Sequence, residues 1–313
     1  MQILEDKIIK ELIEMLKKKL RKNNISSNVT LSAPRFVFVC GKEIKEGQDT
    51  IRKYTIKRLE KFKAKNDYGT EYKSVLCVTS EYLYVQDLSE DIFSFEKMLA
   101  EISDKIIIVA ESPGTFCELG AFVMDEQCRN KTIVINEDKE EYKNSFITKG
   151  PVKTLENRDE QSVILHNGLE WLKFSSVYDD LINKVANETL KIHINNDSKQ
   201  IHLKSLIYEL ANIIEIFQPL EFFEIEKLYK KIKDFDNYEI LNTEGHKIRS
   251  IKKVLVLMER IGLVKKDKGY YIINKKISCY NIMFTISRKE FNDVRIKYIN
   301  RMDKYQPQRM EIL

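Results

Sequence analysis

The chain has 313 residues, which is enough for about two domains of ordinary size. A composition of 43% hydrophobic and 32% charged residues excludes an intrinsically disordered protein, and no run reaches the ~18 apolar residues that a membrane span needs. The net charge of +5 is uneven, because residues 251–313 carry 15 Lys and Arg against 6 Asp and Glu. This basic end predicts a polyanionic partner, although ordinary solvated lysines explain the same excess.

The first 22 residues, MQILEDKIIKELIEMLKKKLRK, mix charged with apolar residues and lack the apolar core of a signal peptide. They predict an amphipathic helix whose lysine-rich end lies at its C-terminus, where the helix dipole favours cations. The five cysteines are scattered and have no CxxC spacing, which favours reduced thiols and predicts no metal site. We therefore expect a cytoplasmic protein without a membrane partner.

Short apolar runs alternate with helical patterns along the next part of the chain. The first run predicts a buried strand that ends at Cys40-Gly41. The next four predict buried strands at 73–80, 105–112, 131–138 and 161–166. Helical spacing of apolar residues predicts helices at 49–65, 94–104, 115–130 and 169–192. This alternation predicts an α/β domain with a doubly wound parallel sheet, in which the carboxyl ends of the strands meet at one edge.

The segment 195–199, NNDSK, is the predicted boundary to a second domain. Helical patterns at 201–217, 222–235 and 245–264 precede a predicted β-hairpin at 265–274. Helices followed by a charged hairpin are typical of a winged helix-turn-helix domain, mostly α. Its candidate nucleic-acid-binding residues are Arg249, Lys252, Lys253, Lys265, Lys266 and Lys268. A winged helix that binds protein is the alternative.

The chain lacks the common motifs of nucleotide-binding and hydrolytic enzymes. There is no GxGxxG after a strand, no GxxxxGK[ST], no HExxH and no GxSxG. The four histidines are scattered, and none is paired with a candidate nucleophile. Carboxylates are therefore the candidate catalytic groups.

Residues 111–120, ESPGTFCELG, place two glutamates around a Pro-Gly turn directly after the apolar run KIIIVA. Gly114 permits close approach of a ligand, and the free N–H groups at the start of the next helix favour an anion or sugar hydroxyls. A structural interpretation fits the same spacing. In it, Thr115 caps the helix, Glu118 closes a capping box and Glu111 is a solvated strand end.

The motif resembles the core motif of the nucleoside 2-deoxyribosyltransferase family, which has a flavodoxin-like fold and cleaves N-glycosidic bonds through a glutamate nucleophile. Together with FVFVCGKEI, FEKMLAEISD and NSFITKGPV, it more closely resembles the effector proteins of retron defence systems. These join such a domain to a C-terminal winged-helix domain. The resemblance covers about residues 30–155 well. Where the ribosyltransferase family has Asp-Ser-Gly-Thr, this chain has Glu111 and an inserted Pro113.

Carried over residue by residue, the resemblance implies that Glu118 is the nucleophile that attacks the anomeric carbon of a ribosyl group. Glu111 would bind sugar hydroxyls or assist proton transfer, and Glu96 would contact the leaving base. The implied substrate-binding residues are Gly41, Ser112, Gly114 and Thr115. NAD or a related nucleotide would be the substrate, without a cofactor, because a cationic nicotinamide ring leaves as a neutral base without being protonated.

The resemblance also implies an organisation and partners. The domains would be an N-terminal amphipathic helix at 1–30, a nucleoside deoxyribosyltransferase-like domain at 31–195 and a winged-helix domain at 196–313. The protein would be a toxic anti-phage effector, an N-glycosidase kept inactive by the retron reverse transcriptase and its msDNA and msrRNA. Hydrolysis and base transfer both fit, and a higher-order assembly is left open. The alternative is a winged-helix nucleic-acid-binding regulator whose α/β domain binds a nucleotide without cleaving it.

Overall fold

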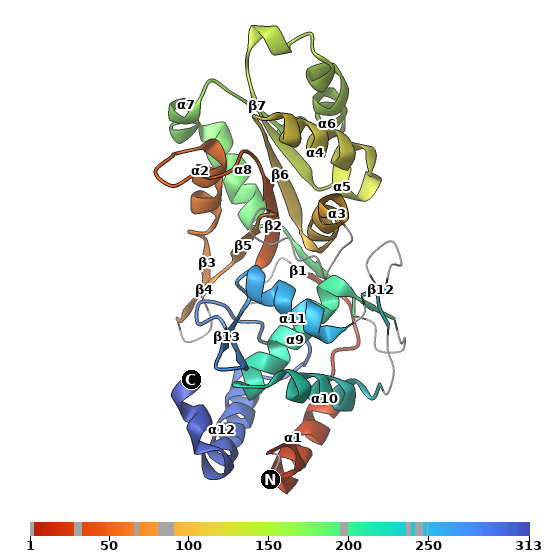
Figure 1. The fold of residues 1–313 in the computed structure, drawn as a ribbon, viewed down its shortest axis with the longest axis vertical. Coiled ribbons are helices and arrows are strands. Elements are labelled where there is room, and N and C mark those ends of the chain that lie inside the picture. Colours follow the sequence, from red (N-terminus) through yellow and green to blue (C-terminus); the bar gives the residue numbers. More distant parts are fainter. Residues whose placement is uncertain are drawn as a thin grey trace. The chain divides into compact units, whose positions relative to one another are not determined.

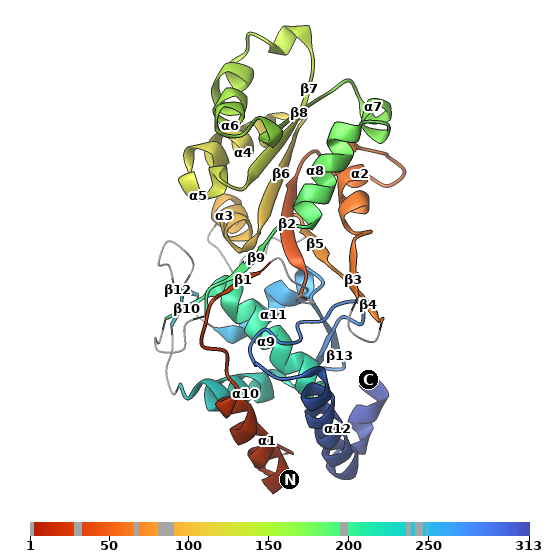
Figure 2. The same ribbon diagram turned by 180° about the vertical axis from the view of Figure 1, so that it is seen from behind.

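The structure, a computed structural model, describes residues 3–27, 33–65, 69–80, 91–194, 200–235, 239–241, 247–248 and 250–313. The chain forms two compact units, drawn as ribbons in Figures 1 and 2. The α/β unit comprises Arg35–Lys63 and Lys73–Thr189. The helical unit comprises Met1–Pro34, Ala64–Tyr72 and Leu190–Leu313. The predicted boundary segment 195–199 lies outside the described residues.

The α/β unit is built on a five-stranded parallel sheet with the strand order β5-β2-β6-β7-β8. The strands are β2 (Arg35–Cys40), β5 (Val75–Val78), β6 (Lys105–Ala110), β7 (Thr132–Glu137) and β8 (Val163–His166). In chain order this is 2-1-3-4-5, which is consistent with the predicted flavodoxin-like core. The order reverses between β2 and β6, and doubly wound sheets bind ligands beyond the carboxyl ends of the strands at such a point.

Helices cover both faces of this sheet (Figures 1 and 2). One face carries α2 (Ile51–Leu59) and α8 (Ser176–Ala186), and the other carries α3 (Ile92–Ile102), α4 (Pro113–Met124) and α5 (Glu126–Arg129). Strand β2 is buried along its whole length, and after Arg35 it is apolar throughout, as suits a strand between two helical layers. Phe38 of β2 packs edge to face on Phe122 of α4, with ring centroids 6.0 Å apart. The remaining segments are η2 (Glu140–Tyr142), η3 (Thr148–Val152), α6 (Lys153–Arg158), η4 (Glu160–Ser162) and α7 (Leu169–Lys173).

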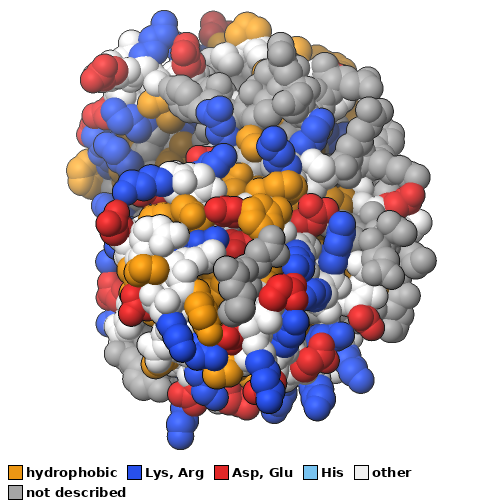
Figure 3. All heavy atoms as spheres, turned by 60° about the horizontal axis from the view of Figure 1, so that its bottom comes forward, with side chains coloured by type: hydrophobic (Ala, Val, Ile, Leu, Met, Phe, Trp, Pro, Cys, Tyr) orange, Lys and Arg blue, Asp and Glu red, His pale blue; other side chains and the backbone are white. Residues whose placement is uncertain are grey.

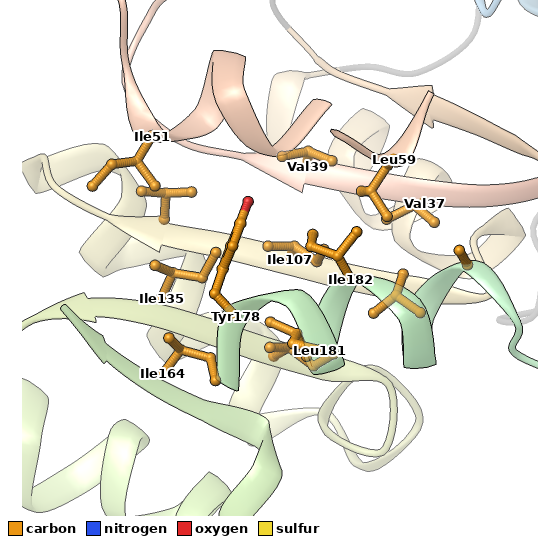
Figure 4. Packing of buried hydrophobic residues seen from close by; sticks show 14 of the residues in the cluster. Val37, Val39, Ile51, Leu59, Ile107, Ile135, Ile164, Tyr178, Leu181 and Ile182 are labelled. Carbon is orange, nitrogen blue, oxygen red and sulfur yellow. The ribbon is translucent and has the colours of Figure 1, made fainter. Parts of the chain in front are cut away.

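Tyr178 of α8 lies in the middle of the apolar core on the α2 side of the sheet (Figure 4). Its ring is fully buried, and its hydroxyl lies 2.8 Å from the Oγ1 atom of Thr55 on α2. The ring also stacks on Tyr54, with centroids 5.8 Å apart. Tyr178 therefore joins α8 to α2 by packing and by a hydrogen bond.

The prediction of one continuous helix over 169–192 is wrong. The segment is divided into α7, α8 and the strand β9 (Leu190–Ile192). The division has a local cause, because the Ser175 side chain accepts a hydrogen bond from the Tyr178 N–H and so starts a new helix. Strand β9 then pairs antiparallel with β1 (Ile25–Ser27).

The helical unit surrounds a long helix, α9 (Leu203–Phe217), in which almost every residue is buried. Its other helices are α1 (Lys7–Lys18), α10 (Phe222–Lys233), α11 (Ile251–Arg260) and α12 (Arg288–Tyr305), with η1 (Ile3–Glu5) and η5 (Pro307–Ile312). Short strands are β3 (Lys63–Lys65), β4 (Glu71–Lys73), β10 (Gln200–His202), β11 (Glu239–Leu241) and β12 (Lys247–Ile248). The buried Glu209 of α9 is paired, with Lys233 at 2.9 Å and with Tyr229 at 2.7 Å.

The predicted hairpin is confirmed as β13 (Val264–Asp267) and β14 (Tyr270–Ile273). Lys268 and Gly269 between them have φ values of 46° and 89°, and positive φ at both central residues is typical of the tightest hairpin turns. A helix is also present in the predicted N-terminal segment 1–30, with Lys17 and Lys18 in its last turn, but it covers only Lys7–Lys18, and β1 lies in the same segment. The winged helix-turn-helix assignment stays a prediction. In the part of the chain that the structure describes, no helix is both long and apolar enough to cross a membrane.

The position of Tyr178 leads to a stability prediction. Tyr178→Ala should lower the free energy of unfolding by about 3–5 kcal/mol, because a large buried ring is removed. Tyr178→Phe should lower it by only about 1 kcal/mol, because Thr55 keeps its hydrogen bond to the Ile51 carbonyl at 2.8 Å. Chemical denaturation of the three proteins checks this order. Equal losses for the two variants would show that the hydroxyl, not the packing, joins the helices.

Candidate active site

The predicted catalytic glutamates lie at the carboxyl edge of the parallel sheet, around the ends of β2 and β6. Glu111 directly follows β6, and Glu118 lies in the second turn of α4. Glu96 lies on α3 and is 9% exposed. Its charge acts on Glu118, so the structure brings these two carboxylates together. The reversal of strand order between β2 and β6 opens the sheet edge at this place.

The turn before α4 is held by a capping box that does not include Glu118. Ser112 is the N-cap and accepts a hydrogen bond from the Thr115 N–H, while the Thr115 Oγ1 atom accepts from the Ser112 N–H at 3.0 Å. The structural interpretation of the motif, in which Thr115 caps the helix and Glu118 closes the box, is therefore wrong. Pro113 occupies the first helical position, where a missing N–H group costs nothing.

The predicted substrate-binding residues share this turn, apart from Gly41 at the end of β2. The hydroxyl groups of Ser112 and Thr115 are 3.2 Å apart and take part in the cap. Gly114 is exposed, and a Cβ atom added there would meet nothing closer than the Ser112 Oγ atom at 4.0 Å. The surface above Gly114 is thus open to a ligand.

Glu118 is in an environment that disfavours its charge. Its Oε2 atom is buried and has no hydrogen-bond partner among the described residues. Burial raises the pKa of Glu118 to about 7, and the negative charge of Glu96 acts in the same direction. A hydrogen bond with Cys40 and the positive charge of Arg52 oppose these two effects. Glu118 is therefore balanced between its protonated and ionised forms near neutral pH.

Glu111 is partly buried, and burial raises its pKa. The Lys42 N–H donates to its Oε1 atom at 3.2 Å, which favours the ionised form. The charges of Lys42 and Arg52 also favour ionisation, whereas Glu137 at the end of β7 disfavours it. Glu111 is thus anchored by one oxygen to the turn after β2.

Two residues of this site were not found from the sequence, Cys40 and Arg52. Cys40 is buried at the end of β2, and burial raises its pKa well above the ordinary value, with Glu118 and Glu96 adding to the effect. Its thiol therefore stays neutral and can donate to a carboxylate. The only sequence signal for Cys40 is its place beside Gly41 at a strand end. Arg52 belongs to a basic helical pattern that gives no such signal.

The predicted nucleic-acid-binding lysines are mostly exposed, but they do not all lie on one face. Lys252 and Lys253 are in the first turn of α11, with Lys253 half-buried. Lys265 and Lys266 are neighbours on β13 and so point to opposite faces of the hairpin. Lys268 lies in the hairpin turn, 3.4 Å from Glu311. Arg249 lies outside the described residues.

Elsewhere in the helical unit, several basic side chains are paired with acidic ones. Figure 3 shows Lys and Arg interspersed with Asp and Glu on the face where α1, α10 and α12 come forward. Lys10 lies 2.8 Å from Glu5, and Lys17 lies 3.3 Å from Asp234. This face is therefore less suited to a polyanion than its lysine count suggests.

The raised pKa of Glu118 makes the stability of the protein depend on pH. Between pH 4.5 and about 7, the native state keeps a proton on Glu118 that the unfolded chain has lost, so stability falls as pH rises. Glu118→Gln removes this penalty. We expect the variant to be more stable than wild type by about 2 kcal/mol at pH 8, with the difference vanishing toward pH 4.

Thermal and chemical denaturation across this pH range measures the difference, with the exposed Glu141→Gln as the control. A constant difference between pH 4 and pH 8 would show that Glu118 ionises as an ordinary surface glutamate.

Comparison with known proteins gives the family. Residues 48–266, more than two thirds of the chain, match the family model described as "STM3845 retron effector protein". The chain is 27% identical over 252 residues to the Escherichia coli protein named "Retron Ec73 putative ribosyltransferase/DNA-binding protein", and the match covers 76% of each chain. It is 41% identical over 93 residues to the E. coli protein named "Retron Ec86 putative ribosyltransferase/DNA-binding protein", covering 27% of this chain and 30% of that one. The predicted resemblance to retron effectors is confirmed, and the chain belongs to the STM3845 retron effector family.

Proposed function

We propose that this retron effector is an N-glycosidase that cleaves the bond between ribose and base in NAD or a related nucleotide, with Glu118 as the nucleophile. The observation that carries the proposal is the environment of Glu118: a buried carboxylate oxygen without a hydrogen-bond partner among the described residues, beside a second carboxylate at the sheet edge. Groups with such perturbed pKa values cluster at functional sites. The names of the two relatives, both of which include ribosyltransferase, support the same class of chemistry.

The reaction would proceed in two steps, as in retaining glycosidases. In the first, the ionised Glu118 carboxylate attacks C1′ of the ribose. The bond from C1′ to the ring nitrogen breaks, and its electron pair neutralises the cationic nicotinamide. In the second, water attacks C1′ and the bond to the Glu118 oxygen breaks. Glu118 regains the electron pair, and the proton of the water passes to Glu96 or Glu111.

A pKa of about 7 suits this role, because the substrate itself changes the charge balance. In the free enzyme, burial and the charge of Glu96 hold a proton on Glu118 for part of the time. A cationic ring bound beside Glu118 favours the ionised form, which is the nucleophile. We assign the second oxygen of Glu111 to the ribose hydroxyls, since its first oxygen accepts from the Lys42 N–H.

Regulation by the retron would depend on the partners of the family. We propose that the reverse transcriptase and its msDNA hold the effector inactive until phage infection releases it. Membership of a retron effector family and the basic residues 251–313 support this proposal. Release from inhibition would then let the enzyme deplete its nucleotide substrate.

A second candidate function is nucleic-acid-binding regulation, in which the α/β unit binds a nucleotide without cleaving it. The exposed lysines of α11 and of the β13–β14 hairpin favour a polyanionic partner. The names of both relatives include DNA-binding. This candidate does not account for the environment of Glu118, because a sensor needs no carboxylate at the anomeric carbon.

The activity prediction concerns release of free base. Purified wild type, freed from retron partners, should release nicotinamide from NAD, and Glu118→Gln should lower the rate at least about 100-fold, while Glu141→Gln should not. For wild type, kcat/KM should rise with pH through about 7, since Glu118 must be ionised. Chromatography of the free base measures both effects. The rate losses of Glu96→Gln and Glu111→Gln show which of these two residues contributes more to base release.

Two results would count against parts of this proposal. No base released from NAD or from deoxynucleosides would exclude the enzyme and favour the regulator. Full activity in Glu118→Gln would exclude only the nucleophile assignment.

The nucleic-acid prediction concerns the salt dependence of binding. Lys252→Ala should weaken binding to single-stranded DNA and reduce the slope of log Kd against log salt by about 1, because one phosphate contact is lost. Lys143→Ala in the α/β unit, where the lysine pairs with Glu140, is the matched control. Fluorescence anisotropy across a salt series measures the slopes, and equal slopes for the two variants would place the binding surface elsewhere.

A further inference from the structure

Arg52 is a fully buried cation at the start of α2, with 1% of its surface exposed. Its Nε–H donates to the Val39 carbonyl at 3.1 Å. Its Nη1 group donates to the carbonyls of Gly41 and Lys42, at 3.0 and 3.2 Å. These carbonyls belong to the end of β2 and to the turn that follows, so one side chain fixes the backbone at the edge of the sheet.

Gly41 packs directly against the aliphatic part of the Arg52 side chain. A Cβ atom at Gly41 would lie 2.7 Å from the Arg52 Cδ atom and 3.0 and 3.1 Å from its Cβ and Cγ atoms. The φ angle of Gly41 is not among the positive ones, so no left-handed backbone calls for glycine here. Packing against Arg52 therefore explains why position 41 has no side chain.

The contact continues to a candidate catalytic group through Lys42. The Lys42 carbonyl accepts from Arg52, and the Lys42 N–H donates to the Glu111 Oε1 atom at 3.2 Å. Arg52, the turn and Glu111 thus form a chain of hydrogen bonds from α2 to the end of β6. The turn cannot move without moving the partner of Glu111.

The charge of Arg52 also reaches the glutamates. It opposes the rise in pKa that burial causes in both Glu118 and Glu111. Around Glu118, Glu96 acts against it and Cys40 acts with it; around Glu111, Glu137 acts against it and Lys42 acts with it. Arg52 is therefore a cation that both carboxylates share.

We propose that Arg52 is a positioning residue of the glutamate site: it fixes the turn after β2 that orients Glu111, and it places a buried positive charge beside Glu111 and Glu118. It acts through these groups and not by binding substrate, because its guanidinium is buried against backbone carbonyls. The role in catalysis rests on the proposed function, whereas the effect on the two carboxyl groups does not.

The test is a ¹³C NMR titration of the glutamate side-chain carboxyls in the full chain, with Glu118→Gln and Glu111→Gln to assign the signals. Arg52→Gln should raise the titration midpoints of both residues by about one pH unit. Arg58→Gln is the matched control, because Arg58 lies on the same helix but pairs with Asp179 at 2.6 Å, and it should leave both midpoints unchanged. Unchanged midpoints in Arg52→Gln would overturn the proposal.

Arg52→Lys tests the turn separately and guards against a glutamine variant that does not fold. Lysine keeps the positive charge, so the Glu118 midpoint should stay near the wild-type value. It loses the several N–H donors of the guanidinium that hold the backbone carbonyls of the turn. Hydrogen exchange of the Lys42 amide should become faster, and kcat/KM for base release should fall about tenfold. Wild-type exchange together with wild-type kcat/KM would overturn the positioning role. If the wild type releases no base while the midpoints shift as expected, the N-glycosidase proposal fails and the effect of Arg52 stands.

Discussion

Repulsion between the buried carboxylate of Glu96 and the partly buried carboxylate of Glu118 is the constraint on which the candidate site depends. Glu96 on α3 and Glu118 on α4 come from helices on the same face of the sheet, and each lies where water is partly excluded. A cluster of this kind lowers the stability of the folded chain whenever both groups ionise. The neutral thiol of Cys40 and the charge of Arg52 reduce the repulsion without removing it. Glu118 therefore loses its proton near neutral pH.

The capping box of Ser112 and Thr115 leaves the Glu118 side chain free of any role in starting α4. Ser112 accepts from the Thr115 N–H, and Thr115 accepts from the N–H groups of Glu111 and Ser112, so Glu118 has no part in starting the helix. Pro113 adds rigidity at a position where its missing N–H is harmless. Pro113 thus fits the start of α4 without disturbing the cap, and Glu118 lies about one turn beyond Thr115.

Much of the fold could be predicted from the sequence because its strands are short apolar runs buried on both faces. Their short length, their Val and Ile content and the turn residues around them distinguish such runs from buried helices, and strands β2, β5, β6, β7 and β8 all coincide with predicted runs. The break at Ser175 was missed, since apolar spacing continues across it and the cap depends on local geometry. Glu118 was found because a motif surrounds it. Arg52 was not, because a basic residue in an amphipathic helix is normally solvated, and only the long-range approach of the β2 turn shows that this one is buried.

The proton held near Glu118 connects the choice of substrate to the charge of the leaving base. When the base is cationic, as in NAD, its departure needs no acid, and the ionised glutamate is the reactive form. When the base is neutral, as in a deoxynucleoside, its departure is helped by a proton, and one member of the Glu96 and Glu118 pair must then remain protonated while the other attacks. The two candidate substrates would therefore require different protonation states of the same pair. The proposed cleavage of NAD would need an ionised nucleophile and no acid, and the positive charge of Arg52 favours the ionised form of Glu118 against burial and the charge of Glu96.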